Sequence, residues 1–319
     1  MNLSPDSINR VAIIIVNWNG GGTLGACIAK VLDAQRALPG LKLEIIICDN
    51  ASTDGSIEQI GESESLKIIR NKQNLGFGAA CNRAVSASTS DAILFLNPDL
   101  MLDPESLRRA VVFLSEDSAK KYAGCGISLY AENGQLSRTC SRKPTFIDLL
   151  LGTRISNRVR KSPFTLEEKW HYADNDVFHS IAAFLLIRRS VFARLNGFDE
   201  NFPLYLEDLD LSERIQAGGW KIRFLHCGST IHIGGGTSKQ IPVERIALSL
   251  AARIIYARKH LSKAEAFLIT LSIYTLESPI RLVYFTITQK RPALKLVYLL
   301  RATLNSHKRN HKDILKVEA

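Results

Sequence analysis

The sequence predicts an α/β protein with a largely parallel, doubly wound sheet whose two faces are covered by helices. Three observations lead to this prediction: short β-branched apolar segments alternate with segments of helical periodicity, the connections between them are short, and polar loops follow the strands. Short apolar runs without alternation are typical of strands that are buried on both faces. Ligands of such sheets bind beyond the carboxyl ends of the strands.

The first three elements are expected to be a strand, a helix and a second strand. Residues 11–16 read VAIIIV, which is too short for a helix and suits a buried strand. A helical pattern runs from about residue 23 to residue 38, where a Pro-Gly pair ends it. The segment 43–48 predicts the second strand, and the polar segment 49–56 is expected to lead into a short helix.

The alternation continues beyond residue 60. Residues 66–69 predict a third strand, 76–87 a helix and 92–96 a fourth strand. The next helix is expected to open at Asp103-Pro104, because aspartate favours the cap position and proline favours the first helical position.

Two acidic clusters follow apolar runs, at positions where a fold of this kind binds its ligands. Residues 97–99 (NPD) follow the fourth strand, at the edge where the loops 17–22 and 49–56 also emerge. Residues 207–210 (EDLD) follow another apolar run, 202–206. Carboxylates at the edge of a buried sheet are costly to desolvate, so they are often present for chemistry. A metal site in one cluster and a proton acceptor in the other would suit transfer of a group from a phosphorylated donor. The alternative is that each acid caps a helix.

A glycine-rich segment raises a second possibility. Residues 20–25 (GGGTLG) satisfy the G-x-G-x-x-G pattern of dinucleotide-binding proteins, and Asp49 ends the next strand, so an NAD-dependent dehydrogenase is an alternative. Residues 17–19, however, separate the first strand from the first glycine, whereas the tight phosphate turn needs that glycine almost at the strand end. The dehydrogenase also leaves the two acidic clusters unexplained.

Five segments, taken in order, resemble the inverting family 2 glycosyltransferases of the GT-A fold, especially the bacterial rhamnosyltransferase-like members. They are VAIIIVNWN (11–19), ICDNASTDGS (47–56), NKQNLGFGAACN (71–82), AILFLNPD (92–99) and the segment 180–220. Five ordered motifs are far more specific than any one of them. The resemblance implies a GT-A type, Rossmann-like central sheet flanked by helices, and transfer of a sugar from a nucleotide-diphosphate donor.

The resemblance also assigns residues to the nucleotide-sugar site. The acid that matches Asp49 reads the nucleotide base in the family, although Asp49 can also open its loop as an Asx turn. Asn17 and Trp18 follow the first strand, and Trp18 either flanks the base or packs in the core. Arg70 and Asn74 lie where a helix N-terminus can meet the charge of the donor, and Arg70 can equally be a solvated surface residue.

Residues 97–99 occupy the place of the family's Asp-x-Asp metal motif. Asp99 can coordinate a divalent ion on the donor diphosphate, whereas Asn97 replaces the first acid, so weaker metal binding is expected. His232 ends another β-like run and matches a residue that contacts the metal or the diphosphate in family members; a structural role is its alternative. The expected cofactor is Mg²⁺ or Mn²⁺, and a histidine ligand favours Mn²⁺.

Asp208 is the expected catalytic base, because it matches the second acid of the family's acidic pair and direct displacement with inversion needs a single base. Glu207 is expected to hold the acceptor or to act on Asp208 as a nearby like charge. Asp210 is expected to cap a helix over 211–216. Ala182-Ala183 stands where relatives usually carry a glycine pair or Gly-Ala beneath the sugar, which leaves the transferred sugar open.

The C-terminal segment accounts for the whole net positive charge of the chain. The net charge is +10; residues 1–238 contain 26 basic and 26 acidic side chains, and residues 239–319 contain 15 and 5. A one-sided apolar pattern at 243–261 and a further pattern at 293–304 predict amphipathic helices. Residues 266–287 are strongly apolar, but Glu277, Pro279 and Arg281 are expected to interrupt them, and the longest uncharged stretch, 266–276, is shorter than the ~20 residues that span a bilayer. We expect interfacial helices drawn to an anionic membrane surface, or helices that pack on the catalytic domain.

Composition leads to expectations about the cellular compartment and the binding partners of the protein. Six scattered cysteines without a C-x-x-C pair fit reduced thiols in a cytoplasmic protein, and no secretory signal is recognised at the start. No nucleic-acid partner is expected, because no fold-level reader accompanies the charge. We expect three parts: a nucleotide-sugar-binding half at 1–120, an acceptor and catalytic half at 121–238, and a basic, membrane-associating helical extension at 239–319.

The sequence therefore predicts a metal-assisted, inverting glycosyltransferase that is peripheral on the cytoplasmic face of a bacterial membrane. The expected donor is a dTDP- or UDP-activated sugar, with rhamnose favoured by the resemblance, and the expected acceptor is a lipid-linked saccharide of an envelope polysaccharide. A non-catalytic, membrane-associated scaffold is a further alternative, since Asn97 and Ala182 depart from the family pattern. Oligomeric state is not predicted.

Overall fold

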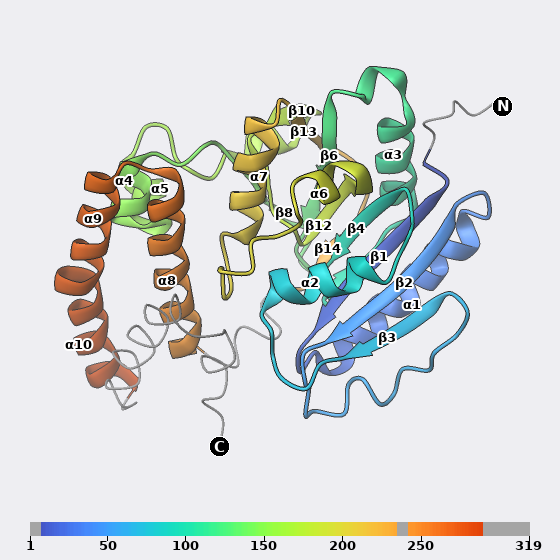
Figure 1. Cartoon of the computed structure of the whole chain (residues 1–319), viewed down its shortest axis with the longest axis horizontal. Helices are drawn as coiled ribbons and strands as arrows, with labels where there is room; N and C mark the ends of the chain where they lie inside the picture. The colour runs from blue at the N-terminus through green and yellow to red at the C-terminus, as the bar shows by residue number, and fades with distance from the viewer. Residues whose placement is uncertain (1–7, 235–241, 290–319) are drawn as a thin grey trace.

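Strands and helices alternate in the computed structural model, which describes residues 8–234 and 242–289 (Figure 1). The strands are β1 (Arg10–Asn17), β2 (Lys42–Asp49), β3 (Leu66–Arg70), β4 (Ala92–Leu96), β5 (Leu100–Met101), β6 (Tyr122–Ile127), β7 (Leu129–Tyr130), β8 (Leu136–Ser137), β9 (Cys140–Ser141), β10 (Asn175–Val177), β11 (His179–Ser180), β12 (Phe184–Arg188), β13 (Lys221–Leu225) and β14 (Ile231–His232). The helices are α1 (Gly21–Ala37), α2 (Phe77–Ser86), α3 (Pro104–Ser115), α4 (Phe146–Leu151), α5 (Thr153–Val159), α6 (Arg189–Arg194), α7 (Glu207–Ala217), α8 (Pro242–His260), α9 (Lys263–Ser272) and α10 (Ser278–Gln289).

The first half of the central sheet follows the prediction. The sheet has eight strands in the order β10-β13-β6-β12-β4-β1-β2-β3, and the last four of these are parallel neighbours. Asp103 caps α3, because its side chain accepts a hydrogen bond from the backbone N–H of Ser106. The strands and helices expected between residues 11 and 115 are confirmed, apart from one helix.

The prediction of a short helix after the loop 49–56 is wrong. Turns occupy residues 56–59. The carboxylate of Asp54 accepts hydrogen bonds from the backbone N–H and the hydroxyl of Ser56, and Gly55 adopts a positive φ of 74°. These local bonds satisfy the backbone in a turn and so compete with a helix.

The second half of the sheet is mixed, which corrects the expectation of a parallel sheet. β12 is antiparallel to both β4 and β6, and β10 is antiparallel to β13. Phe184 at the start of β12 lies opposite Leu96 at the end of β4. An antiparallel strand therefore brings the residues that precede it, Ala182 and Ala183, to the carboxyl edge of β4, where the predicted metal motif also lies.

Helices cover both faces of the sheet, and side chains of β1 alternate between them. Ile13 and Ile15 pack in a core with residues of α1 and α3, whereas Ile14 packs in a second core with residues of α2, α6 and α7. Each fully buried aliphatic side chain of this size contributes about 1.5–3 kcal/mol to folding. All six cysteines are free and buried, in agreement with unpaired thiols.

The C-terminal helices form a hairpin at one end of the molecule (Figure 1). α8 packs against α9 and contributes to a third apolar core, in which Tyr256 and Ile254 lie with Phe202 and Leu209 from the segment around the start of α7. Ser262 and Glu265 form a capping box that begins α9. The extension is therefore fixed to the catalytic half through the same segment that carries the second acidic cluster.

The apolar pattern at 266–287 forms one continuous helix through α9, a π-helical turn at Ile273–Glu277 and α10. Glu277 and Pro279 do not end it: the π-helical turn lies just before Pro279, at the place where proline cannot donate a hydrogen bond to the preceding turn. Among the described residues, the segment Lys263–Tyr284 is long and apolar enough to cross a membrane by length and composition, which the sequence interpretation did not anticipate. The helix expected at 293–304 lies outside the described residues.

Candidate active site

Asn17 and Asp49 meet at the carboxyl ends of β1 and β2. The side-chain amide of Asn17 donates to Asp49 Oδ1 at 2.8 Å, and both side chains are buried. Asp49 also accepts from the backbone N–H of Ser52 at 3.0 Å and from its hydroxyl. The turn expected as an alternative for Asp49 is present. A carboxylate offers about four acceptor positions, and these three bonds leave room for one more donor, such as the N–H of a base.

The other predicted donor-site residues lie in loops at the same edge. Trp18 is half-buried after β1, and Arg70 is exposed at the end of β3, where it lies opposite Asp49 in the register of β2 and β3. The side chain of Asn74 accepts a hydrogen bond from the backbone N–H of Gly76 at 2.9 Å. Gly76 has a φ of 83°, and a Cβ there would lie 2.6 Å from the carbonyl oxygen of Pro203, so this loop packs against the segment that leads into α7.

Asp99 and His232 form a pair at the end of β4. His232 Nε2 lies 3.3 Å from Asp99 Oδ1, and the side chains are 18% and 10% exposed. Strand β14 sets this distance, because it pairs with β5 and holds His232 opposite Leu100. The described residues contain no cluster of three or more side chains with the arrangement of a metal site. A carboxylate and an imidazole suit a divalent ion whose other ligands are phosphate oxygens or water.

Asp208 lies in the first turn of α7, after two residues with unusual backbone angles. Tyr205 and Leu206 have φ values of 71° and 64°, which are strained for side chains of this size. The carboxylate of Asp208 accepts from the backbone N–H of Ala182 at 3.1 Å and from that of Leu209 at 2.8 Å. These neutral donors orient the carboxylate without supplying a full countercharge.

A short path of hydrogen bonds joins the two acidic clusters. The backbone N–H of Asn97 donates to the carbonyl of Ala183 at 2.9 Å, and the backbone N–H of Ala182 donates to Asp208 at 3.1 Å. Ala182 and Ala183 are both buried. The antiparallel start of β12 therefore links the end of β4 to the start of α7, although the two acids are distant in the sequence.

His179 is a neighbour of Asp208 that sequence reasoning missed. Its Nε2 lies 3.9 Å from Asp208 Oδ2, and its Nδ1 lies 3.1 Å from the hydroxyl of Ser212. Burial lowers the pKa of His179, and the negative charge of Asp208 offsets this only in part. A neutral imidazole therefore borders the carboxylate near neutral pH. Its position just before the segment 180–220 was the only signal in the sequence.

Residues 12–195 match the sequence model of glycosyl transferase family 2. The chain belongs to this family. The dehydrogenase alternative is therefore rejected. The glycines at 20–25 do not have the roles that they have in a dinucleotide-binding turn. A Cβ at Gly20 would lie 2.4 Å from Asn17 Oδ1, whereas one at Gly25 would meet no atom within 4 Å, so Gly25 provides no close packing of helix on strand.

Relatives of this glycosyltransferase include rhamnosyltransferases. An N-acetylglucosaminyl-diphospho-decaprenol L-rhamnosyltransferase of Mycobacterium tuberculosis is 22% identical over 254 residues, which cover 74% of this chain and 80% of the relative. Rhamnosyltransferase WbbL of Escherichia coli is 29% identical over 166 residues, which cover 49% of this chain and 60% of the relative. A mannosyltransferase from Pyrobaculum calidifontis, solved with GDP-Man and Mn²⁺, has a TM-score of 0.52 at 15% identity, covering 96% of this chain and 84% of that chain. The glycosyltransferase has the GT-A fold.

Glu207 of the glycosyltransferase points away from solvent. It is 5% exposed, and its Oε2 has no hydrogen-bond partner among the described residues. Burial and the charge of Asp208 raise the pKa of Glu207 to about 8. Direct contact with an acceptor does not fit this burial. The other predicted role, an effect on Asp208 as a neighbouring acid, fits the geometry and stays a prediction.

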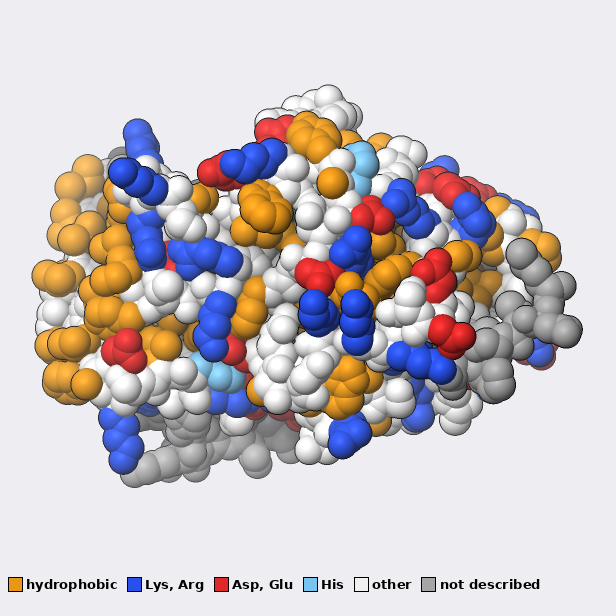
Figure 2. All heavy atoms as spheres, turned by 90° about the horizontal axis from the view of Figure 1, so that it is seen from above, with side chains coloured by type: hydrophobic (Ala, Val, Ile, Leu, Met, Phe, Trp, Pro, Cys, Tyr) orange, Lys and Arg blue, Asp and Glu red, His pale blue; other side chains and the backbone are white. Residues whose placement is uncertain are grey.

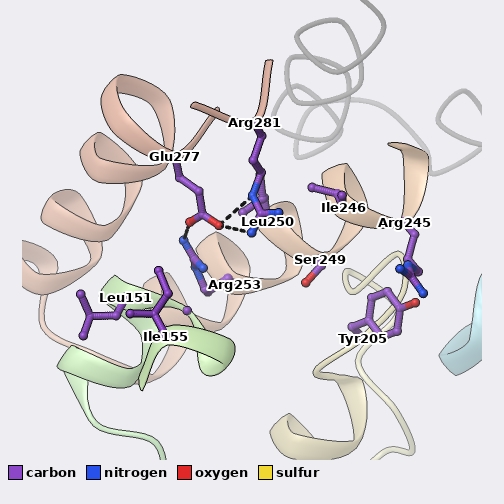
Figure 3. A pocket seen from close by; sticks show the side chains of 11 residues that line it. Leu151, Ile155, Tyr205, Arg245, Ile246, Ser249, Leu250, Arg253, Glu277 and Arg281 are labelled. Atoms are coloured by element: carbon purple, nitrogen blue, oxygen red, sulfur yellow. Dashed lines mark hydrogen bonds and ion pairs between the residues drawn. The ribbon is translucent and has the colours of Figure 1, made fainter. Parts of the chain in front are cut away.

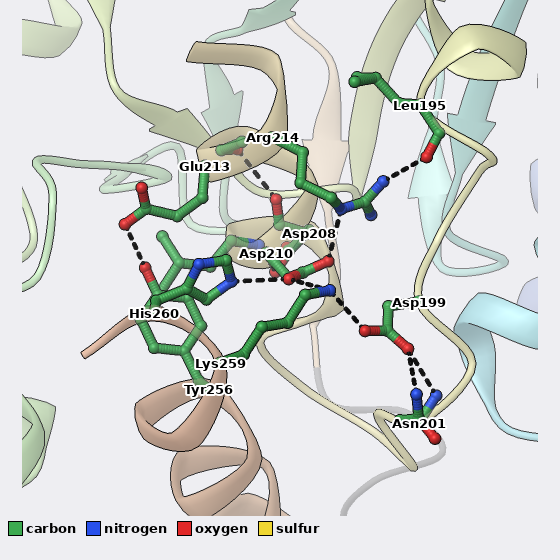
Figure 4. A network of polar contacts seen from close by, with 12 residues as sticks. Leu195, Asp199, Asn201, Asp208, Asp210, Glu213, Arg214, Tyr256, Lys259 and His260 are labelled. Atoms are coloured by element: carbon green, nitrogen blue, oxygen red, sulfur yellow. Dashed lines mark hydrogen bonds and ion pairs between the residues drawn. The ribbon is translucent and has the colours of Figure 1, made fainter. Parts of the chain in front are cut away.

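Asp210 does not cap α7, which corrects the sequence expectation. The helix begins at Glu207, and the fully buried carboxylate of Asp210 contacts Arg214 Nε at 2.8 Å, Lys259 Nζ at 2.7 Å and His260 Nε2 at 2.7 Å (Figure 4). Burial alone would raise the pKa of Asp210, but hydrogen bonds from His260 and Lys259 and the charge of Arg214 lower it to about 2. This acid fixes α8 to α7.

Proposed function

We propose that this glycosyltransferase moves rhamnose from a dTDP- or UDP-activated donor to a lipid-linked saccharide, with inversion at the anomeric carbon. The two relatives described above are rhamnosyltransferases, and one is named for an acceptor in which a sugar is joined to a polyprenol through a diphosphate. The observation that carries the proposal is the hydrogen-bonded path from Asn97 through Ala183 and Ala182 to Asp208. It supports a shared cleft for donor and acceptor.

Asp208 is proposed as the base. It takes the proton of an acceptor hydroxyl while that oxygen forms a bond to the anomeric carbon, and the bond from this carbon to the diphosphate breaks, so that the nucleoside diphosphate leaves with its electron pair. A base must keep a free lone pair. The carboxylate of Asp208 keeps one, because each oxygen accepts only one backbone N–H.

The donor side uses the edge formed by β1, β2 and β3. Asp49 is proposed to read the base, held in place by Asn17, while Trp18 flanks the base. Arg70 and the loop of Asn74 are proposed to meet the phosphates. The exposure of Arg70 and the remaining acceptor position of Asp49 support these roles.

Asp99 and His232 are proposed to hold a divalent ion, Mg²⁺ or Mn²⁺, with Asn97 nearby as a weaker ligand. The paired carboxylate and imidazole fit such an ion, and when bound it would offset negative charge on the leaving diphosphate. Two side chains make a weak site by themselves, so the donor diphosphate is expected to supply further ligands.

The enzyme is proposed to be peripheral on the inner face of the membrane. Figure 2 shows apolar side chains gathered at the end of the molecule formed by α9 and α10. Those at least 44% exposed include Phe267, Leu271, Leu276, Ile280, Val283 and Ile287. A helix that crossed the bilayer would carry Glu277 and its arginine partners to membrane depth, which is costly, whereas a helix in the interface leaves them among the headgroups.

The test combines a donor screen with analysis of the product. A true donor is expected to raise the melting temperature in the presence of Mn²⁺, because a ligand of the native state stabilises it by mass action. Transfer from that donor to a saccharide on a polyprenyl diphosphate is then measured, and the anomeric configuration of the product is determined by NMR. Absence of transfer from every nucleotide sugar, or retention of configuration, would overturn the proposal.

A further inference from the structure

A cavity of about 360 Å³ lies between the C-terminal helices and the loop that leads into α7 (Figure 3). Its floor is one face of α8, from Arg245 to Arg253. These residues are eight positions apart in the helix, which corresponds to about 12 Å. α4, α5 and the start of α10 contribute the other walls. The cavity is separate from the residues assigned to the donor.

The cavity carries a surplus of positive charge. Three arginines and one glutamate line it: Arg245, Arg253, Arg281 and Glu277. Glu277 pairs with both Arg253 and Arg281, at 2.6 Å in the second pair. No ion pair is found for Arg245 within the described ranges, and Arg253 is 8% exposed with an unpartnered Nε. The lining therefore has a formal charge of +2, and arginine is the side chain best suited to bidentate contact with phosphate.

The remainder of the lining is apolar. Leu151 and Ile155 lie at the end of the cavity formed by α4 and α5, opposite the end where Arg245 and Tyr205 lie (Figure 3). Ile155 is 55% exposed, so this end opens toward solvent. A simple phosphate would not use these side chains. A ligand with a charged diphosphate and an adjoining hydrocarbon chain would use both the arginines and the apolar end.

The cavity is also joined to the catalytic loop. Tyr205 lines it and precedes Asp208 by three residues, in the strained segment before α7. Glu277 pairs with Arg253 of α8 and with Arg281 of α10, so these two arginines join the helices, whereas Arg245 has no ion pair in the described part of the chain. A ligand whose headgroup contacts Arg245 would lie beside Tyr205, in the segment that leads to Asp208.

We propose that this cavity binds the diphosphate and the first isoprenoid units of the lipid-linked acceptor. The inference rests on the proposed function, because it names the site that receives the acceptor. The two negative charges of a diphosphate diester match the charge of +2, and the apolar end receives the hydrocarbon chain. The attached saccharide then extends past Tyr205 to Asp208.

Calorimetric titration of the full chain with farnesyl diphosphate, inorganic diphosphate and farnesol tests the cavity directly. Farnesyl diphosphate is expected to bind at least about tenfold more tightly than either of the other two, since only it has both parts. Arg245→Gln is expected to weaken farnesyl diphosphate about tenfold. Ile155→Gln is expected to weaken it about threefold and to leave inorganic diphosphate unchanged.

Arg258→Gln is the matched control, because Arg258 is an exposed arginine on α8 that does not line the cavity. Equal affinity in the wild type and Arg245→Gln, equal losses in Arg245→Gln and Arg258→Gln, or inorganic diphosphate binding as tightly as farnesyl diphosphate would each overturn the inference. In transfer assays, Arg245→Gln is expected to raise the KM for the lipid acceptor with the donor KM unchanged. A wild type that transfers no sugar but binds farnesyl diphosphate through Arg245 would refute the proposed function and leave the cavity as a lipid diphosphate site.

Discussion

Asp208 and Asp210 lie two residues apart on the same helix, in opposite environments. Asp208 is partly exposed and accepts hydrogen bonds from backbone N–H groups. Asp210 is fully buried and contacts an arginine, a lysine and a histidine. A carboxylate surrounded by cations is held in its charged form and contributes to packing, whereas one oriented by neutral donors can still accept a proton. Neighbouring positions in the sequence thus have different roles, a proposed chemical one for Asp208 and a structural one for Asp210.

Asp208→Asn is expected to have the largest effect on activity and almost none on folding. An amide cannot take a proton from the acceptor, so kcat should fall about a thousandfold, while donor binding in a thermal-shift assay and the melting temperature stay close to wild type. Asp33→Asn, on the exposed surface of α1, is the control. Undiminished transfer by Asp208→Asn would assign the base to another residue and remove the contrast between the two acids.

Asp210→Ala is expected to show the reverse pattern. Removing the carboxylate takes the buried acid from Arg214 and His260 and leaves Lys259 with Asp199 alone, which should lower the free energy of unfolding by about 3–5 kcal/mol. The folded fraction should retain kcat within a few-fold. Chemical denaturation measures the first quantity and assays below the melting temperature measure the second. A large loss of kcat at unchanged stability would show that Asp210 belongs to the chemistry.

Variants of residues 97–99 test whether the other acidic cluster binds a metal ion. Asp99→Asn is expected to weaken Mn²⁺ in the presence of the donor about 10–100-fold, because it replaces the stronger of two predicted oxygen ligands by an amide. Asn97→Asp should change affinity in the opposite direction, about tenfold, since it restores a second carboxylate. The apparent metal affinity follows from activity at varied Mn²⁺ concentration. Insensitivity of both variants would remove this segment from the metal site.

Glu207→Gln is expected to change the stability of the protein in a way that depends on pH. The pKa of Glu207 is raised from an ordinary value of 4.5 to about 8, so its contribution to stability is fully present below pH 4.5 and is lost as the pH rises through 8. Glutamine stays neutral throughout. The variant should therefore gain melting temperature relative to wild type between pH 6 and pH 9 and show no gain at pH 4. A constant difference across this range would contradict the assignment.

The sequence alone identified the alternating strands and helices of the first half, the family, and the acids at both ends of the proposed chemistry. These features depend on local patterns: apolar runs such as residues 11–16, the cap at Asp103 and the ordered motifs around Asp49 and Asp99. Periodicity and capping are properties of neighbouring residues, so they can be read along the chain.

Tertiary structure decided what each acid touches. The antiparallel direction of β12 brings Ala182 and Ala183 between the two clusters. Helix α8 packs against α7, so that Lys259 pairs with Asp210, and it places Arg253 in the same cavity as Tyr205. These contacts join residues that are 26 to 86 positions apart. A local sequence pattern does not predict such neighbours, because burial and charge pairing depend on elements that are distant in the sequence and meet only in the folded structure.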